Sequence, residues 1–323
     1  MAGHEIRTLT DGDKITEPGF YNISMERHHG QPCDGPSVTS GVLRRMHFHG
    51  PSKVWAHHQL NPNAYPDEDS LALRLGRAMA ALVEGGTDEL DKHFKILPEN
   101  RPNRPTKAQL RALKEGRETS TARRSIAFWG DMDRDPRDEL TESQYDLICR
   151  MGLALANDPA ASAALSGLPE ITMAHYDEST RLWCLSRPDN VSFDSTMSDY
   201  KKVNTQGRPF SSWLVDQRIE DHGYDMQMAF AAEAFEALTG QTPSSVGLVF
   251  QEDAPPFDVI PRGLEEEDLS IGRFHNRMAL TRFRECLDAD HWPGPGEHVG
   301  NFHRNDERRA RIIEEMQIAG TAP

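Results

Sequence analysis

The segments Arg187-Pro188-Asp189-Asn190 and Asp199-Tyr200-Lys201 decide how this 323-residue chain is interpreted. The second segment lies within residues 197–203, whose pattern predicts a β-strand. Because side chains alternate along a strand, Asp199 and Lys201 are expected on the same face, about 6.5 Å apart. A carboxylate and an ammonium group alone would form an ordinary ion pair. Whether Asp199 and Lys201 have a catalytic role therefore depends on which other acidic residues reach that face.

Two further acidic residues are expected at the same edge of the sheet. Glu170 begins the first strand of a predicted hairpin whose second strand spans residues 182–186, and Asp189 follows that hairpin. Three carboxylates at one strand edge repel one another unless protons or a divalent cation neutralise them. Oxygen ligands favour a hard ion, so Glu170, Asp189 and Asp199 are predicted to bind Mg²⁺ or Mn²⁺. Lys201 would then orient or deprotonate the water that attacks a phosphodiester.

The rest of the chain is predicted to build an α/β fold around these segments, with a mixed central sheet flanked by helices. Helical patterns dominate the first half. Asp69, for example, is a candidate cap for a helix whose apolar stripe ends at Gly85-Gly86. The predicted organisation is an extended lead-in at residues 1–36, a helical N-terminal portion at 37–168, a catalytic core at 169–297 and a polar C-terminal tail at 298–323. Within the core, helices are expected at 224–238 and 265–287 and further strands at 245–251 and 257–261.

Composition narrows the class of protein. Thirty-six Lys plus Arg against fifty-one Asp plus Glu give a formal charge of −15. This excludes a generally basic nucleic-acid coat but not DNA binding, because phosphate contacts depend on where the cations lie. No segment approaches the roughly 18 apolar residues of a membrane helix, and the start lacks the pattern of a signal peptide, so a cytoplasmic protein without a membrane partner is expected. The four cysteines are widely spaced and predict reduced thiols rather than disulfides or an iron–sulfur cluster.

One segment departs from the acidic average. Residues 101–124 carry eight Lys or Arg against two Glu, a local balance of +6. This is the best candidate for a surface that faces DNA phosphates, although a solvated helix face with a flexible flank is the alternative. The residues expected to contact DNA there are Arg101, Arg104, Lys107, Arg111 and Lys114.

Together, the central motifs resemble the nuclease core of the RecE type (exodeoxyribonuclease VIII), a member of the PD-(D/E)xK superfamily close to the RecB-like nucleases. The resemblance rests on the order of four elements along the chain: Glu170, Arg187-Pro188-Asp189, Asp199-Tyr200-Lys201 and the helix that begins Gly223-Tyr224-Asp225-Met226-Gln227. Weaker similarities extend it over roughly residues 19–296.

The resemblance implies a role for each matching residue. Asp189 and Asp199 match metal-binding acidic residues, and Lys201 matches the catalytic lysine. Glu170 matches an acidic residue that serves as a ligand or orients one. Gln227 matches the glutamine of a Q-x-x-x-Y helix that helps to position DNA and the region of the lysine. Tyr224 lies one turn earlier on the same helical face, where it would be placed to contact a phosphate.

Two positions depart from the family pattern. Ala80 stands where the family usually has a metal-binding histidine, four residues after the glycine of a G-x-x-x-H helix, and Ala231 stands where the tyrosine of Q-x-x-x-Y belongs. Without the histidine the metal site would hold more water, which Mg²⁺ tolerates. Four histidines of the preceding segment are the candidate substitutes, namely His47, His49, His57 and His58.

The resemblance therefore implies a Mg²⁺-dependent exonuclease that degrades linear duplex DNA from its ends in phage or prophage recombination. It also implies a ring-shaped homo-oligomer and a single-strand annealing protein as partner. Two alternatives stay open. One is a DNA-end-binding subunit with weakened or absent catalysis, and the other is an endonuclease of the same superfamily.

Overall fold

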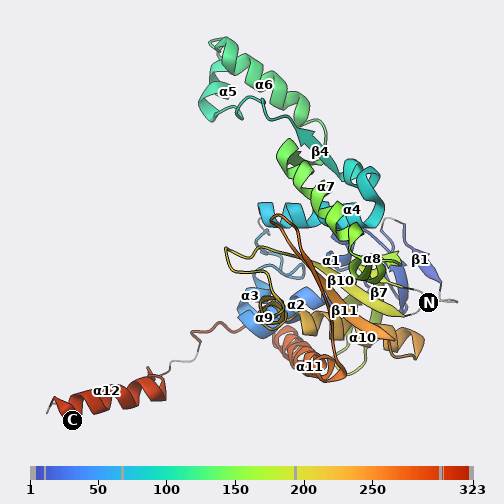
Figure 1. Cartoon of the computed structure of the whole chain (residues 1–323), viewed down its shortest axis with the longest axis vertical. Coiled ribbons are helices and arrows are strands. Elements are labelled where there is room, and N and C mark those ends of the chain that lie inside the picture. Colours follow the sequence, from blue (N-terminus) through green and yellow to red (C-terminus); the bar gives the residue numbers. More distant parts are fainter. Residues whose placement is uncertain are drawn as a thin grey trace.

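The structure is a computed structural model that describes residues 5–10, 12–66, 69–192, 195–297, 300 and 302–319 (Figure 1). The strands in these residues are β1 (Ile6–Thr8), β2 (Gly19–Asn22), β3 (Ser37–Thr39), β4 (Phe94–Leu97), β5 (Asp138–Thr141), β6 (Leu168–Pro169), β7 (Thr172–Asp177), β8 (Leu182–Ser186), β9 (Asn190–Val191), β10 (Thr196–Val203), β11 (Ser245–Glu252) and β12 (Val259–Gly263). The helices are α1 (Met25–His29), α2 (Ser40–His49), α3 (Pro51–Trp55), α4 (Leu71–His93), α5 (Lys107–Lys114), α6 (Ser120–Met132), α7 (Glu142–Asn157), α8 (Pro159–Ala164), α9 (Ser212–His222), α10 (Tyr224–Thr239), α11 (Glu266–Ala289) and α12 (Asp306–Ile318).

The sheet that carries the Asp-x-Lys segment has the strand order β12-β11-β10-β9-β6. β10 runs parallel to β11, with Asp199 opposite Leu248 and Lys201 opposite Phe250, while β9 and β12 are antiparallel to their neighbours. Parallel strands are usually covered on both faces, and β11 accordingly reads as an apolar run whose middle is buried. The predicted mixed α/β architecture is confirmed.

The predicted hairpin belongs to a different sheet. β7 and β8 pair antiparallel as expected, but they lie in the order β1-β2-β7-β8-β3. The expectation that the hairpin and residues 197–203 share one central sheet is therefore wrong. Alternation identifies a strand and its faces but does not specify its partner, and β10 finds its parallel partner β11 about 50 residues further along the chain.

The expected lead-in at residues 1–36 contains regular structure, which corrects that prediction. β2 pairs with β1 on one side and with β7 on the other, and its Phe20 and Tyr21 are buried. α1 follows directly, with the Ser24 side chain accepting a hydrogen bond from the Arg27 amide. Strands of three or four residues between Gly and Pro leave too short a pattern to recognise in the sequence.

Helix α10 links the two sheets, because it packs against β7 and β8 of one and β10 and β11 of the other. α11 crosses α10 closely at Gly272, where a Cβ would lie 2.7 Å from the Asp225 carbonyl oxygen. α11 also packs on α2. The short helix α9, which the sequence analysis does not predict, joins α10 at Gly223 in the left-handed conformation (φ +62°).

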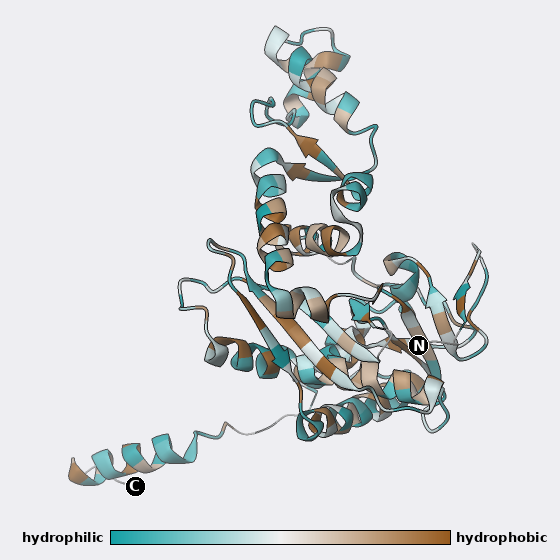
Figure 2. Ribbon diagram, turned by 45° about the vertical axis from the view of Figure 1, so that its right-hand side comes forward, coloured by the Kyte–Doolittle hydropathy of each residue, from teal (hydrophilic) through white to brown (hydrophobic). Residues whose placement is uncertain are grey.

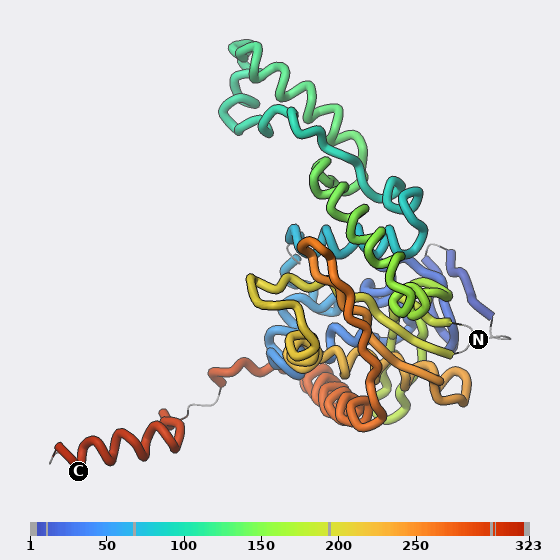
Figure 3. Tube along the Cα trace, viewed as in Figure 1, coloured from blue at the N-terminus to red at the C-terminus, as the bar shows by residue number. Residues whose placement is uncertain are grey.

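An arm projects from this body (Figures 1 and 3). α4 and α7 form its base, the parallel pair β4–β5 continues it, and α5 and α6 lie at its far end. The predicted end of a helix at Gly85-Gly86 is a kink in the structure, since both residues are non-helical yet the helix resumes as far as His93. Ser70 rather than Asp69 caps α4, and Asp69 instead pairs with Arg74 and Arg77.

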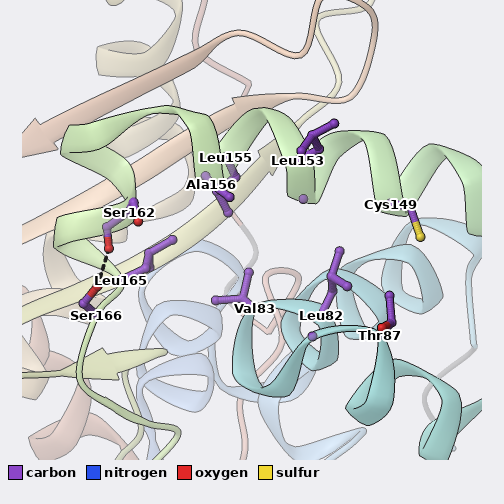
Figure 4. A pocket seen from close by; sticks show the side chains of 12 residues that line it. Leu82, Val83, Thr87, Cys149, Leu153, Leu155, Ala156, Ser162, Leu165 and Ser166 are labelled. Carbon is purple, nitrogen blue, oxygen red and sulfur yellow. Dashed lines mark hydrogen bonds between the residues drawn. The ribbon is translucent and has the colours of Figure 1, made fainter.

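An apolar cavity of about 490 Å³ lies where the arm meets the body (Figure 4). Its side chains come from α4 and from α7 and the residues that follow it, among them Leu82, Val83, Leu153 and Leu165. Gly152 permits this packing, because a Cβ there would collide with the Leu82 side chain. Figure 2 shows apolar residues on the facing sides of the α4 and α7 ribbons. No charged residue of the described chain lines this cavity, and its Val83 and Leu165 also line the small cavity beside Glu170 and Asp189.

The C-terminal helix α12 extends away from the body, and none of its described residues is buried (Figure 1). Residues 298, 299, 301 and 320–323 of the expected tail lie outside the described residues. In the part of the chain that is described, no helix is long and apolar enough to cross a membrane. Cys33, Cys149, Cys184 and Cys286 form no disulfide with one another.

Candidate active site

β10 places Asp199 and Lys201 on one face, as the alternation predicts. The Lys201 ammonium contacts the Asp199 carboxylate directly, and the two side chains are only 16% and 3% exposed. The neighbouring Tyr200 points to the opposite face, where its hydroxyl donates to Gln251 Oε1 at 2.8 Å and helps to fix the strand. The ammonium and the carboxylate are thus held together in a nearly dry environment.

Asp189 joins this pair from the segment before β9. Its carboxylate accepts a hydrogen bond from the Tyr200 amide at 2.7 Å, and its own amide donates to Asp199 Oδ1 at 3.3 Å. Burial, followed by the negative charge of Asp199, raises the pKa of Asp189. Burial lowers the pKa of Lys201, but the charges of Asp199 and Asp189 outweigh it and raise that pKa overall. The two carboxylates therefore need a proton or a cation between them.

Glu170 lies beside this pair but not on a strand, which corrects the prediction that it begins the hairpin. It connects β6 to β7 with a positive φ of 49°, and its amide donates to the Asp189 carbonyl oxygen at 3.3 Å. Its carboxylate forms a largely buried ion pair with Arg187. The arrangement is that of a residue whose charge is already partly neutralised, which fits an orienting role better than that of a direct ligand.

A small cavity of about 50 Å³ connects Glu170 and Asp189 to the helix α4. Ala80, the position of the missing histidine, lines this cavity, and so does Glu84 one turn later. Burial and then the charge of Glu170 raise the pKa of Glu84. Glu84 belongs to none of the motifs recognised in the sequence. Its spacing of four residues from Ala80, on the same helical face, is the signal that indicates it.

The histidines considered as substitutes lie elsewhere. The His47 ring packs at a tilt against the His275 ring, with centroids 4.4 Å apart, and His58 is buried against Phe283. His57 and His58 line a different cavity. None of the four is among the described residues that surround the cavity beside Asp189.

α10 contributes the residues of the Q-x-x-x-Y helix. The Tyr224 ring lies 4.7 Å from Lys201 Nζ, close enough for a cation–π contact that orients the ammonium. Gln227 Oε1 is buried and lacks a hydrogen-bond partner. Ala231 is 1% exposed within the core, so a tyrosine there would not fit without repacking. Arg44 of α2, which was not predicted from the sequence, also lies at the site, with its guanidinium 5.7 Å from the Tyr224 ring.

The five basic residues expected to contact DNA lie between β4 and the end of α5, on the arm, whereas Asp199 and Lys201 lie on β10 in the body (Figure 1). Arg104 is engaged by Asp133 at 3.0 Å and Glu139 at 2.7 Å, and Arg101 donates to the Pro98 carbonyl oxygen. Lys107, Arg111 and Lys114 are exposed and share one face of α5, because their spacing is i, i+4 and i+7.

The donor set around Asp189 fits a hard divalent cation only in part. Within the described ranges, no three His, Cys, Asp or Glu side chains lie close enough together to hold a metal ion. Two buried carboxylates nevertheless converge, and Asp199 Oδ2 contacts the Lys201 ammonium, a contact that a bound cation would share or displace. Mg²⁺ commonly uses one or two carboxylates and completes its shell with water. Asp189 and Asp199 would hold such an ion, which on binding would polarise a phosphodiester and acidify water.

A Pro-Asp segment beside a strand that carries Asp-x-Lys, in a mixed sheet flanked by helices, defines the PD-(D/E)xK class of nuclease folds. The chain belongs to the family described as a PDDEXK-like domain of unknown function (DUF3799), whose model matches residues 48–305. Family and fold together support a nuclease. The predicted superfamily is thereby confirmed, whereas the RecE type is narrower than this match.

Among solved structures, the chain resembles a candidate exonuclease from Eubacterium rectale, with a TM-score of 0.58 and 13% identity over 89% of this chain and 98% of that one. A phage-related exonuclease from Haemophilus somnus 129PT also matches, with a TM-score of 0.30 and 13% identity over 58% and 91% of the two chains. At this identity the first likeness shows the fold alone. A comparison with functionally curated proteins finds no match.

Proposed function

We propose that this protein is a Mg²⁺- or Mn²⁺-dependent DNA exonuclease that hydrolyses phosphodiester bonds at the ends of linear duplexes, as RecE-type enzymes do in phage-type recombination. The observation that carries the proposal is the buried contact between Lys201 and Asp199, with Asp189 hydrogen-bonded to the same strand. A protein that only needed stability would gain little from two carboxylates and an ammonium buried together. Such a cluster is typical of sites that bind metal and transfer protons.

Each residue of the site has a distinct role in the proposed reaction. Asp189 and Asp199 would hold a divalent cation, which would supply Lewis-acid chemistry at the scissile phosphate. Lys201, whose charged form is stabilised mainly by Asp199, would donate hydrogen bonds that orient the attacking water and stabilise charge that develops on the phosphate oxygens. Tyr224 limits the positions of the ammonium, and Gln227 offers a buried amide for positioning the substrate. Glu170, through Arg187, keeps the Asp189 segment in place.

DNA would reach this site with help from the arm. The exposed stripe of Lys107, Arg111 and Lys114 suits backbone phosphates, and Arg101 and Arg104 lie near its start. A homo-oligomeric ring would gather such stripes around a DNA axis and so reconcile DNA binding with a formal charge of −15. The ring and a single-strand annealing protein as partner are proposals that follow from the RecE-type resemblance.

The test compares linear and circular duplexes of the same sequence, incubated with Mg²⁺ or Mn²⁺ and with the wild type or Asp199→Asn. Release of nucleotides from linear DNA alone, absent in the variant, is the expected result. Cutting of the circle would instead indicate an endonuclease. Binding to ends without hydrolysis in the presence of either metal would indicate a non-catalytic DNA-end-binding subunit. The replacement of the family's histidine and tyrosine by Ala80 and Ala231 would then explain the lost activity.

A further inference from the structure

The long helix α11 carries apolar residues on two opposite faces. One face packs on α10 and α2 and includes the buried residues Leu280 and Phe283. The other face carries Ile271, Phe274 and Met278, whose side chains are 46%, 62% and 58% exposed. A surface helix normally presents polar residues to water on the face away from the core. Three large apolar residues together on that face indicate a surface that another protein covers.

These three residues form a stripe along α11, here called the α11 stripe. Their spacing of three and four residues places them in one row on the helix surface. An exposed charge of opposite sign stands near each end of the row, Glu267 before it and Arg282 after it. Glu267 forms no ion pair with any described residue, and Arg282 forms only an exposed one with Glu285, at 3.3 Å. Both charges are therefore available to a partner.

The order of these residues makes the α11 stripe complementary to a copy of itself. In an antiparallel pair with two-fold symmetry, a residue before the axis meets the residue that lies equally far after it in the other copy. With the axis just after Phe274, Ile271 lies opposite Met278 of the second copy, and Glu267 lies opposite its Arg282. Apolar side chains then meet in the middle of the contact, and opposite charges meet at both ends.

Aromatic rings widen this surface from α11 onto α2. The centroid of the Phe274 ring lies 5.6 Å from that of His275, and the His275 centroid lies 4.4 Å from that of His47. His47 in turn lies 4.8 Å from Phe48, which is exposed. Aromatic residues are enriched in protein interfaces. Because Phe274 and His275 flank the two-fold axis, this row of rings starts at the centre of the contact.

We propose that two copies of this chain associate through their α11 helices, packed antiparallel along the α11 stripe. A second copy is the partner because the surface matches itself twice, once in its apolar residues and once in its charges. Such a contact closes with two copies, so a ring would consist of these pairs joined through a second surface. The inference does not depend on the proposed nuclease activity.

The experiment is sedimentation velocity of the full chain, without DNA or metal. We expect the wild type to change from monomer to dimer between about 1 and 100 µM, as a contact of modest area would do. Phe274→Ser changes an exposed side chain, so the monomer should keep its fold, while the dissociation constant should rise at least about 10-fold. Arg309→Glu, in the exposed helix α12, is the control and should leave the dissociation constant unchanged.

Reversal of the charges tests both the partner and the register. Glu267→Arg and Arg282→Glu should each raise the dissociation constant about threefold or more at low salt, because like charges then meet at both ends of the pair. An equimolar mixture of the two variants should recover the wild-type value, since opposite charges face each other again in the mixed pair. Mixing would not recover association if a substitution had merely destabilised α11.

Three results would overturn the inference. A wild type that stays monomeric up to about 100 µM does so without any variant. Self-association that Phe274→Ser does not weaken would place the contact on a different surface of the chain. Charge reversals that weaken association but are not recovered by mixing would exclude the antiparallel pairing of Glu267 with Arg282.

Discussion

At Asp189, a single carboxylate is held where its charge is disfavoured. Burial and then the charge of Asp199 raise its pKa, so between about pH 4 and neutrality the folded chain retains a proton that the unfolded chain has lost. Folding stability from this group therefore falls as the pH rises. We expect Asp189→Asn to abolish hydrolysis yet to raise the free energy of unfolding by about 1 kcal/mol or more at pH 7. Urea denaturation in EDTA measures the change.

The same variant separates metal binding from folding. Mn²⁺ at concentrations above its dissociation constant should raise the melting temperature of the wild type, because it binds only the folded state. It should leave the melting temperature of Asp189→Asn nearly unchanged. Equal stabilisation of both proteins by Mn²⁺ would show that the ion binds elsewhere and would contradict the assignment.

Two substitutions of Tyr224 separate the role of its ring from the role of its hydroxyl group. Its ring lies against Lys201, so Tyr224→Phe should retain the nucleotide-release rate within about threefold, while Tyr224→Ala should lower it by about 10-fold or more as the ammonium loses its contact. Rates on linear duplex at saturating DNA measure both. A large loss of the nucleotide-release rate in Tyr224→Phe would instead show that the hydroxyl group is required, as expected if it contacts a phosphate directly.

Among the secondary-structure elements, α5 makes the arm testable. Lys107, Arg111 and Lys114 lie on one exposed face, so replacing all three with Gln should weaken duplex binding by about 10-fold at 50 mM salt. The slope of log affinity against log salt concentration should also become shallower, by the equivalent of up to about three phosphate contacts. The matched control replaces three exposed arginines of α12, Arg308, Arg309 and Arg311. An unchanged salt slope in the α5 variant would show that its cations are only solvated.

Individual helices and strands could be predicted from local sequence patterns, but the pairing between distant strands could not. The hairpin β7–β8, the strand β10 and the helix α10 all follow from patterns contained within a few residues, and each lies where it was expected. The pairing of β10 with β11, and of β2 with β7, depends on contacts between distant segments that no local pattern specifies. The Gly85-Gly86 pair marks a real break in helical geometry, but tertiary packing allows the helix to resume beyond it.

The residues of the candidate site could likewise be predicted only where they belong to one local segment of the chain. The alternation in β10 is enough to pair Asp199 with Lys201, since both residues belong to one strand. Arg44 and Glu84 reach the site from α2 and α4, and only the packing of those helices brings them there. Glu170 is adjacent to Asp189 as expected, yet its ion pair with Arg187 was not foreseen, because it depends on the backbone turn at positive φ.

For the whole molecule, buried histidines should set how the fold responds to acid. Burial lowers the pKa of His58 and of His175 to about 4, and the Leu60 amide donates to His58 Nδ1, which requires the neutral ring. The unfolded chain therefore binds more protons than the native one between about pH 6.5 and pH 4. Stability from these groups is complete above pH 6.5 and is lost as the pH falls, by about 2–3 kcal/mol for each histidine at pH 4.

His175→Gln and His58→Gln test this response, because an uncharged amide replaces a ring that would otherwise gain a proton. Each variant is expected to be less stable than the wild type at pH 7.5, since its packing is disturbed, but to lose less stability between pH 6.5 and pH 4.5. Urea denaturation at several pH values gives the slopes, and His303→Gln, at an exposed site near α12, is the matched control. Parallel slopes in wild type and both buried-site variants would mean that other groups, such as carboxylates with lowered pKa, dominate acid unfolding. The shallower slopes expected here would instead place the acid sensitivity in the core that supports β7 and α11, outside the candidate active site.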